Sequence, residues 1–265
     1  MTRSATINVM VQAARKAARH LLRDFGEVEQ LQVSRKGPAD FVSAADRRAE
    51  DTLHYNLEKA RPGYSFLMEE RGAVTGVDRT HRWIVDPLDG TTNFLHGIPL
   101  FSISIALERD GKLVAGLIYN PVSDEMFSAE RGRGAFLNDR RIRVAARQEL
   151  DAAVICCGIP HLGRGDAAQF SRELATIMPV VAGIRRTGSA ALDLAWLAAG
   201  RFDGFFERGL KPWDIAAGIV LLREAGGMIS DHSGRPSEPD RGDVVAANDA
   251  LHPQLLAALK KAGSA

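Results

Sequence analysis

The segment of residues 83–94, with the sequence WIVDPLDGTTNF, limits most strongly what this chain can fold into. It begins like a buried strand and then places Asp86 and Asp89 three positions apart, with Pro87 between them and Gly-Thr-Thr after them. Two carboxylates this close repel each other, and surroundings poor in water strengthen the repulsion. A fold tolerates the pair when a cation lies between the carboxylates. The segment therefore predicts a site for a hard divalent ion such as Mg²⁺ in a turn at the end of a strand.

The residues after the acidic pair predict an anion site beside the metal. The carbonyl of Leu88 is a further oxygen ligand within reach of such an ion. If a helix begins near Gly90 and Thr91, its free N–H groups bind an anion. A metal site next to an anion site indicates phosphate chemistry.

Other acidic residues are candidates for the same site. Glu69 and Glu70 follow a predicted strand, and Asp214 lies in the first turn of a predicted helix. Each candidate also has a simpler explanation. The two glutamates suit a solvated loop, Asp214 suits the dipole at a helix N-terminus, and the pair in residues 86–89 suits a turn with an Asx hydrogen bond. The sequence leaves both interpretations open.

The pattern of predicted elements changes near residue 150. Two helices and a series of strands, including a hairpin within residues 97–121, precede that point, whereas strands and helices alternate after it. We therefore expect an α+β N-terminal half, residues 1–145, with an antiparallel sheet and most of the metal ligands. An α/β C-terminal half, residues 146–265, completes the site, and the two halves pack as one body.

Charge and cysteine content exclude several classes of function. The formal net charge of +1 gives no electrostatic reason for direct nucleic-acid or membrane-surface binding. No apolar run reaches the roughly 18–20 residues of a membrane span, and the N-terminus predicts an amphipathic helix rather than a signal peptide. Cys156 and Cys157 are adjacent, which disfavours a disulfide. We expect a cytoplasmic protein.

Four motifs carry a resemblance to a known family. They are KGPADFVSAAD at 36–46, MEERG at 68–72, WIVDPLDGTTNFLHGIP at 83–99 and KPWDIAAGIVLLREAGG at 211–227. With these motifs the chain resembles the inositol monophosphatase family of Mg²⁺-dependent, lithium-sensitive phosphomonoesterases. The resemblance implies a layered α-β-α-β-α sandwich, of the type shared with fructose-1,6-bisphosphatase, and a homodimer.

The resemblance also implies roles for individual residues. About two to three Mg²⁺ ions would be held by Glu69, Asp86, the Leu88 carbonyl, Asp89 and Asp214. The catalytic residues would be Glu69 and Thr91, which orient and activate the attacking water, and Asp46, which lies behind a more weakly bound ion. The substrate and its phosphate would contact Asp89, Gly90, Thr91, Ala190, Glu207 and Asp214. Lys36 and Asp40 match motif positions to which we assign no chemistry.

The resemblance favours one substrate among several. Thr92 stands where relatives that hydrolyse 3′-phosphoadenosine 5′-phosphate or histidinol phosphate carry lysine, which favours the bacterial inositol 1-phosphate branch. Arg208 departs from that branch, where an apolar residue is common. The alternatives are a sister activity on those two phosphates or on fructose 1,6-bisphosphate, and a non-catalytic partnership with the transcription machinery in antitermination.

Overall fold

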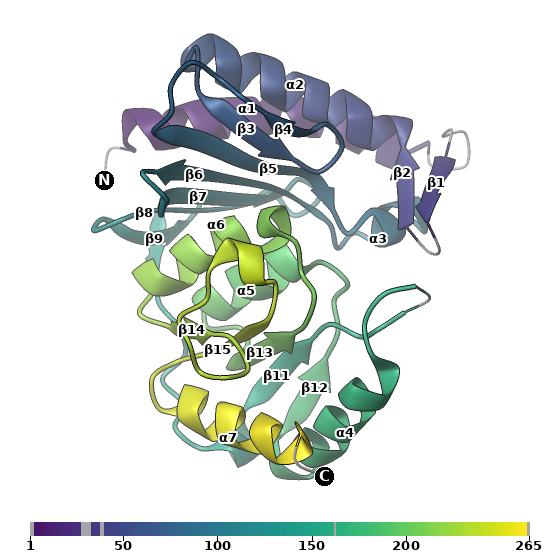
Figure 1. The fold of residues 1–265 in the computed structure, drawn as a ribbon, viewed down its shortest axis with the longest axis vertical. Coiled ribbons are helices and arrows are strands. Elements are labelled where there is room, and N and C mark those ends of the chain that lie inside the picture. The colour runs from purple at the N-terminus through teal and green to yellow at the C-terminus, as the bar shows by residue number, and fades with distance from the viewer. Residues whose placement is uncertain (1–2, 28–32, 38–39, 162, 264–265) are drawn as a thin grey trace.

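Five layers of secondary structure are stacked in the computed structural model (Figure 1). From one outer face to the other they are a helix pair, an eight-stranded sheet, a second helix pair, a five-stranded sheet and a third helix pair. The helix pairs are α1 (Ala5–Phe25) with α2 (Ala44–Ala60), α5 (Ala190–Ala198) with α6 (Pro212–Glu224), and α4 (Ala167–Ile177) with α7 (Leu251–Gly263). This arrangement confirms the predicted α-β-α-β-α sandwich.

The structure describes residues 3–27, 33–37, 40–161 and 163–263. Within these residues, β1 (Val33–Gly37) and β2 (Asp40–Ser43) form a separate antiparallel pair. The side chains of Lys36 and Asp40, both on these strands, lie outside what the structure describes. No helix of the described residues has both the length and the apolar character that crossing a bilayer requires.

The eight-stranded sheet has the order β10-β9-β8-β7-β6-β5-β3-β4. Its strands are β3 (Ser65–Met68), β4 (Gly72–Val74), β5 (His81–Asp89), β6 (Ser102–Arg109), β7 (Lys112–Asn120), β8 (Glu125–Glu130), β9 (Gly134–Leu137) and β10 (Arg140–Ile142). The predicted hairpin is confirmed as β6 and β7. The sheet is not wholly antiparallel, because β5 runs parallel to β3. After β3 the chain reverses and pairs with it as β4, at the edge of the sheet. It then crosses to the other side of β3, where β5 runs in the same direction as β3.

Strand β5 does not end before its acidic pair, which corrects the predicted turn. The strand continues to Asp89, with Asp86 opposite Ser104 and Asp89 opposite Ser102 of β6, so β5 has one residue more than its partner in this stretch. Pro87 has no N–H to donate to the ladder, and a bulge is where a sheet accepts a proline. Side chains three positions apart in a regular strand point to opposite faces. The bulge therefore brings the two carboxylates to the same side.

The five-stranded sheet has the order β12-β11-β13-β15-β14. Its strands are β11 (Val154–Cys157), β12 (Gly183–Arg185), β13 (Gly204–Glu207), β14 (Met228–Ser230) and β15 (Val244–Ala247). Strand β11 is parallel to β12 and β13, which α4 and α5 make possible as crossover helices, while β15 is antiparallel to β13 and β14. The two cysteines are free and buried in β11.

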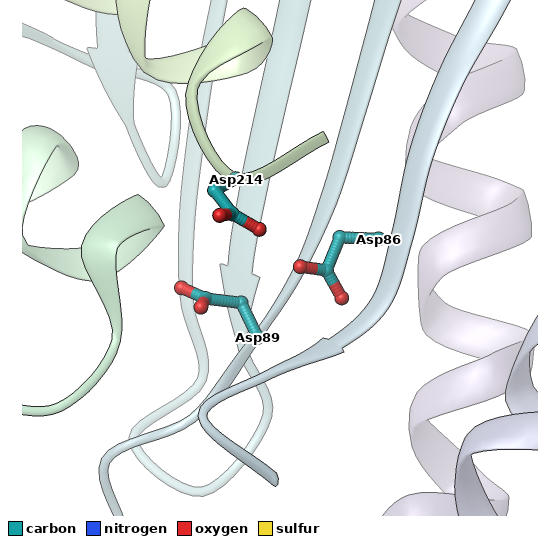
Figure 2. Close-up of side chains that lie close together, drawn as sticks. All are labelled: Asp86, Asp89 and Asp214. Atoms are coloured by element: carbon teal, nitrogen blue, oxygen red, sulfur yellow. The ribbon is translucent and has the colours of Figure 1, made fainter. Parts of the chain in front are cut away.

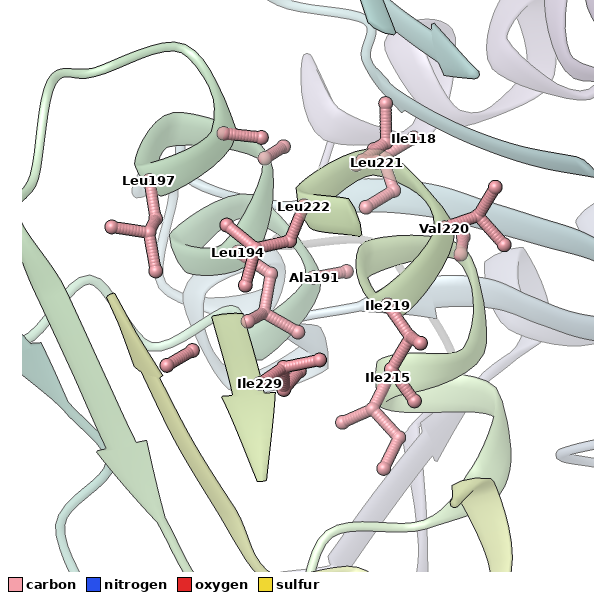
Figure 3. Close-up of a cluster of buried hydrophobic side chains, with 14 of the residues drawn as sticks. Ile118, Ala191, Leu194, Leu197, Ile215, Ile219, Val220, Leu221, Leu222 and Ile229 are labelled. Carbon is pink, nitrogen blue, oxygen red and sulfur yellow. The ribbon is translucent and has the colours of Figure 1, made fainter. Parts of the chain in front are cut away.

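Helix α6 is buried on almost every side because it lies between the two sheets. Leu194 of α5 and Ile215 and Ile219 of α6 belong to one apolar cluster that also contains Ile118 of β7 (Figure 3). Where α6 crosses β7 the strand has Gly116, and a Cβ atom there would lie 2.6 Å from the carbonyl oxygen of Ala217. The glycine lets the helix backbone rest directly on the sheet, which fixes the position of the helix N-terminus.

Candidate active site

Three aspartates from two distant segments converge at the end of the bulged strand. Asp86 and Asp89 come from β5 and Asp214 from the first turn of α6, and one oxygen of each lies within 4.8 Å of the others (Figure 2). The Ser104 hydroxyl of β6 donates to the carbonyl of Trp213 at 3.1 Å, which ties the start of α6 to the strand beside Asp86. The site thus depends on how α6 is docked on the sheet.

Burial raises the pKa values of all three carboxyls, and neighbouring carboxylates raise those of Asp86 and Asp89 further. Burial, and then the charges of Glu69 and Asp89, raise the pKa of Asp86 well above its ordinary value. Burial and the charge of Asp214 raise the pKa of Asp89 to about 7. Burial also raises the pKa of Asp214. A divalent cation reverses this effect because it stabilises the ionised forms. A donor set composed only of oxygens fits a hard ion such as Mg²⁺.

The structure separates the two neighbouring glutamates. Glu69 lies at the end of β3, its N–H donates to the Val85 carbonyl at 3.3 Å, and its side chain hydrogen-bonds to Asp86. It also lines the cleft described below. The N–H of Glu70 is directed to α2 instead, where it donates to Glu50 at 2.8 Å. Glu69 therefore lies beside Asp86 of the acidic cluster, whereas the N–H of Glu70 is bound by α2.

The simpler explanations for the aspartates also hold. The N–H of Leu88 donates to Asp86 Oδ1 at 2.9 Å, which is an Asx hydrogen bond. The N–H of Lys211 donates to Asp214 Oδ2 at 2.8 Å, as expected for an acid at a helix N-terminus. A carboxylate has about four lone-pair sites, so one accepted hydrogen bond leaves others for a metal ion. The structural and the ligand roles are compatible.

Thr91 is held between the acidic cluster and α2. Its hydroxyl lies 3.1 Å from Asp46 Oδ1 and 3.1 Å from the Leu88 carbonyl oxygen. The expected helix begins here as α3 (Thr91–Leu95), and Gly90 precedes it with φ +96°, a backbone conformation that other residues rarely adopt. Leu88, Gly90 and Thr91, which are three of the expected site residues, therefore lie directly beside Asp89 in the chain.

Ser189 is a contact residue that the sequence did not identify. Its hydroxyl donates to Asp89 Oδ2 at 2.5 Å, and the Ala191 N–H donates to the same oxygen at 2.8 Å. Ser189 is also the N-cap of α5. The segment GSAALD carried a signal for the cap, since serine favours that position, but none for a bond to a residue 100 positions away. The start of α5 thus orients Asp89, and Ala190 lines the cleft beside it.

A cleft of about 670 Å³ opens beside the acidic cluster. Among the described residues, its lining contains four cationic side chains besides the carboxylates, those of Arg164, Arg186, Arg208 and Lys211. Arg164 Nη2 lies 3.4 Å from Asp214 Oδ2. Positive charge around an acidic cluster suits a substrate that is itself an anion.

Glu207 lines the cleft at the end of β13. Gly158 gives it room, because a Cβ atom on that glycine would lie 1.9 Å from the Glu207 carboxyl carbon. Burial raises the pKa of Glu207 to about 8. At neutral pH the carboxyl can therefore donate as well as accept a hydrogen bond.

Arg208, which departs from the expected apolar residue, has a structural explanation. Its Nε and Nη2 atoms lie 2.9 and 2.7 Å from Glu173 Oε1, and Nη1 lies 3.2 Å from Asp243 Oδ2. Glu173 is buried on α4 and lines the far end of the cleft. The arginine therefore ties α4 to β13 and neutralises a buried carboxylate.

The raised pKa of Glu207 predicts that Glu207→Gln increases the unfolding free energy, and that the increase grows with pH. Below about pH 4.3, the pKa of a glutamate in the unfolded chain, the carboxyl is neutral in both states. As the pH rises from there to about 8, the carboxyl ionises only in the unfolded chain, so the folded wild-type protein loses stability over this range. Relative to wild type, the variant should gain on the order of 1 kcal/mol of unfolding free energy per pH unit between these limits. Urea unfolding of the metal-free proteins at pH 5 and pH 8 measures this. The exposed Glu149→Gln is the control, and an equal offset at both pH values for Glu207→Gln contradicts the prediction.

Comparisons with known proteins agree over the whole chain. The family model described as the inositol monophosphatase family matches residues 2–264. The chain is 64% identical over 265 residues to a Mesorhizobium japonicum protein named inositol-1-monophosphatase, with 100% of both chains covered. It is 41% identical over 242 residues to the Nus factor SuhB of Vibrio cholerae, with 91% of each covered. The crystal structure of extragenic suppressor protein suhB from Bartonella henselae has a TM-score of 0.95 at 57% identity, covering 97% of this chain and 99% of that one. This chain therefore belongs to the inositol monophosphatase family.

Proposed function

We propose that this protein is a Mg²⁺-dependent phosphomonoesterase that hydrolyses inositol 1-phosphate to inositol and phosphate. The convergence of Asp86, Asp89 and Asp214 beside Thr91, in a cleft that also contains arginine and lysine side chains, is the observation that supports the proposal most strongly. The name of the relative at 64% identity supports the choice of substrate. A homodimer, a cytoplasmic location and lithium sensitivity are parts of the same proposal.

The metal ligands in this proposal are all oxygen donors. They are the carboxylates of Glu69, Asp86, Asp89 and Asp214 and the carbonyl of Leu88. When bound, Mg²⁺ supplies a water of lowered pKa and neutralises charge on the phosphate and the leaving oxygen. The bulge in β5 and the docking of α6 hold the ligands before an ion arrives, so little reorganisation is needed on binding.

Thr91 and Glu69 orient and activate the attacking water. The Thr91 hydroxyl donates to Asp46 or to the Leu88 carbonyl, which leaves its oxygen lone pairs directed elsewhere to accept a hydrogen bond from the water. Glu69, which directly follows β3 and lines the same cleft, accepts the proton that the water loses. No covalent phosphoenzyme is involved, and Cys156 and Cys157 are too deeply buried to act as nucleophiles.

The remaining site residues bind the substrate. The backbone N–H groups of Gly90 and Thr91 contact the phosphate. The inositol hydroxyls contact Asp89, Ala190, Glu207 and Asp214. Because the pKa of Glu207 is about 8, its carboxyl can serve a hydroxyl as donor or as acceptor, which suits a polyol better than an apolar alcohol.

Phosphate release from a substrate panel, with Mg²⁺ and with the metal removed by EDTA, tests the proposal. The panel contains inositol 1-phosphate, glycerol 2-phosphate, fructose 1,6-bisphosphate, histidinol phosphate and 3′-phosphoadenosine 5′-phosphate. We expect inositol 1-phosphate to be preferred, EDTA to abolish release, and added Mg²⁺ to restore it. Preference for another member would keep the chemistry and replace the substrate.

A protein that binds Mg²⁺ but releases no phosphate from any member would contradict the proposed activity. That outcome would favour the partnership with the transcription machinery, a possibility that the name of the Vibrio cholerae relative also raises. A catalytically inactive variant that still rescued a deletion strain would support the partnership directly.

A further inference from the structure

Helix α2 carries two buried carboxylates one helical turn apart. Asp46 and Glu50 are 0% and 1% exposed, which is unusual for acidic side chains. Asp46 contacts the Thr91 hydroxyl on one side of the acidic cluster. Glu50 instead contacts the residues that follow Glu69, and no role has yet been given to it.

The carboxylate of Glu50 binds the chain immediately after Glu69. Its Oε2 accepts the N–H of Glu70 at 2.8 Å, and its Oε1 lies 3.5 Å from Nε of Arg71. The Arg71 guanidinium also pairs with Asp51, on the next position of α2. The connection from β3 to β4 is thus attached to the helix through both backbone and side chain.

These contacts fix the Glu69 residue from both directions. The N–H of Glu69 donates to the Val85 carbonyl of β5, and the N–H of Glu70 donates to the carboxylate of Glu50. With the peptides on either side of its Cα atom held, the Cα–Cβ bond of Glu69 has a set direction, toward Asp86. The restraint therefore helps to hold the Glu69 side chain beside Asp86, to which it hydrogen-bonds.

We propose that Glu50 is a positioning residue that preorganises Glu69 to bind metal. The proposal rests on the proposed function, in which Glu69 is a metal ligand. Glu50 does not line the cleft, so its effect on the reaction passes through the backbone at Glu69 and Glu70. Groups that support a metal ligand in this way typically contribute about 10- to 100-fold to metal affinity.

The test compares three substitutions in the full-length protein. Glu50→Leu removes the acceptor, and Glu50→Gln keeps an oxygen acceptor at the same reach. Glu58→Leu is the matched control, because Glu58 lies on the same helix and accepts a loop N–H, that of Gly63 at 3.2 Å, away from the acidic cluster. Calorimetric titration with Mg²⁺ gives the metal affinity directly, and steady-state kinetics give the Mg²⁺ concentration for half-maximal activity and the substrate KM.

We expect Glu50→Leu to weaken Mg²⁺ binding by about tenfold or more and to raise the half-saturating Mg²⁺ concentration in parallel. The substrate KM at saturating Mg²⁺ should stay within about twofold, since Glu50 touches no substrate group. Glu50→Gln should retain most of the wild-type metal affinity, and Glu58→Leu should retain it fully. If Glu50→Leu does not fold, Glu50→Asp replaces it, because the shorter side chain keeps the charge but cannot reach the Glu70 N–H.

Three results would overturn the proposal: wild-type Mg²⁺ affinity in Glu50→Leu, equal losses in Glu50→Gln and Glu50→Leu, or an equal loss in Glu58→Leu. Failure of the proposed function is distinguishable from all of these. In that case the wild-type protein would hydrolyse no member of the substrate panel, while calorimetry would still report whether Glu50 supports Mg²⁺ binding.

Discussion

Asp89→Asn should lower Mg²⁺-dependent phosphate release by at least about 10²-fold, because it removes one charge from the set of metal ligands. Stabilisation by a bound metal ion is worth several kcal/mol, and each 1.36 kcal/mol corresponds to a factor of ten in rate. The fold should survive, since an asparagine oxygen can still accept the hydrogen bonds from Ser189 and Ala191. The metal-free variant should even be more stable than wild type at pH 8, where the Asp89 and Asp214 charges repel each other.

Steady-state kinetics, calorimetric titration with Mg²⁺ and urea unfolding in EDTA measure these three effects. Asp151→Asn, an exposed aspartate away from the cleft, is the control and should match wild type in all three. Turnover close to wild type in Asp89→Asn would refute the metal assignment of Asp89. A loss of activity together with a loss of metal-free stability would instead indicate a damaged fold.

Gly116→Ala should destabilise the protein more than an ordinary small substitution. The added Cβ atom would lie 2.6 Å from the carbonyl oxygen and 3.0 Å from the Cα atom of Ala217. These are backbone atoms of α6, so the whole helix has to move away from the sheet. Overpacking in a well-packed core typically costs about 1–3 kcal/mol. Since Asp214 lies at the first turn of α6, Mg²⁺ affinity should fall as well.

Urea unfolding and Mg²⁺ titration of Gly116→Ala provide the measurement. The control is Gly26→Ala, where the backbone has φ −72° and the added Cβ would come no closer than 3.4 Å to another atom. That control should be neutral or gain up to about 1 kcal/mol, because alanine restricts the unfolded chain. A fully stable Gly116→Ala protein would show that α6 does not rest on the sheet as closely as described.

The acidic pair illustrates what a sequence can and cannot predict about a site. The spacing of Asp86 and Asp89, with a proline between them, predicts metal ligands, and the structure brings both into one cluster with Asp214. Their geometry was predicted wrongly, as a turn rather than a bulge in a continuing strand. A bulge is defined by the register with β6, whose residues lie some fifteen positions further along the chain, and no local pattern records that register.

The supporting residues were not predicted for a related reason. Ser189, Arg164 and Glu50 are ordinary in their local sequence: a helix cap, a loop arginine and a helix glutamate. Each acquires its role only through a partner in another layer of the fold, respectively Asp89, Asp214 and the Glu70 peptide. The proposed ligands, by contrast, lie in short motifs, because metal binding requires particular residue types at close spacing.

The place of α6 between the two sheets has a consequence for how the protein is made. The last strand of the eight-stranded sheet ends at Ile142, whereas α6, which covers its inner face, ends at Glu224. At a synthesis rate of about 5–20 residues per second, α6 is completed on the order of ten seconds after the last strand of this sheet. During that interval Ile84 and Ile118, which are buried in the apolar cluster with α6 in the folded protein, lack the helix that packs against them. The acidic cluster, which lacks Asp214 until α6 is made, is therefore completed only well after the strand that carries Asp86 and Asp89.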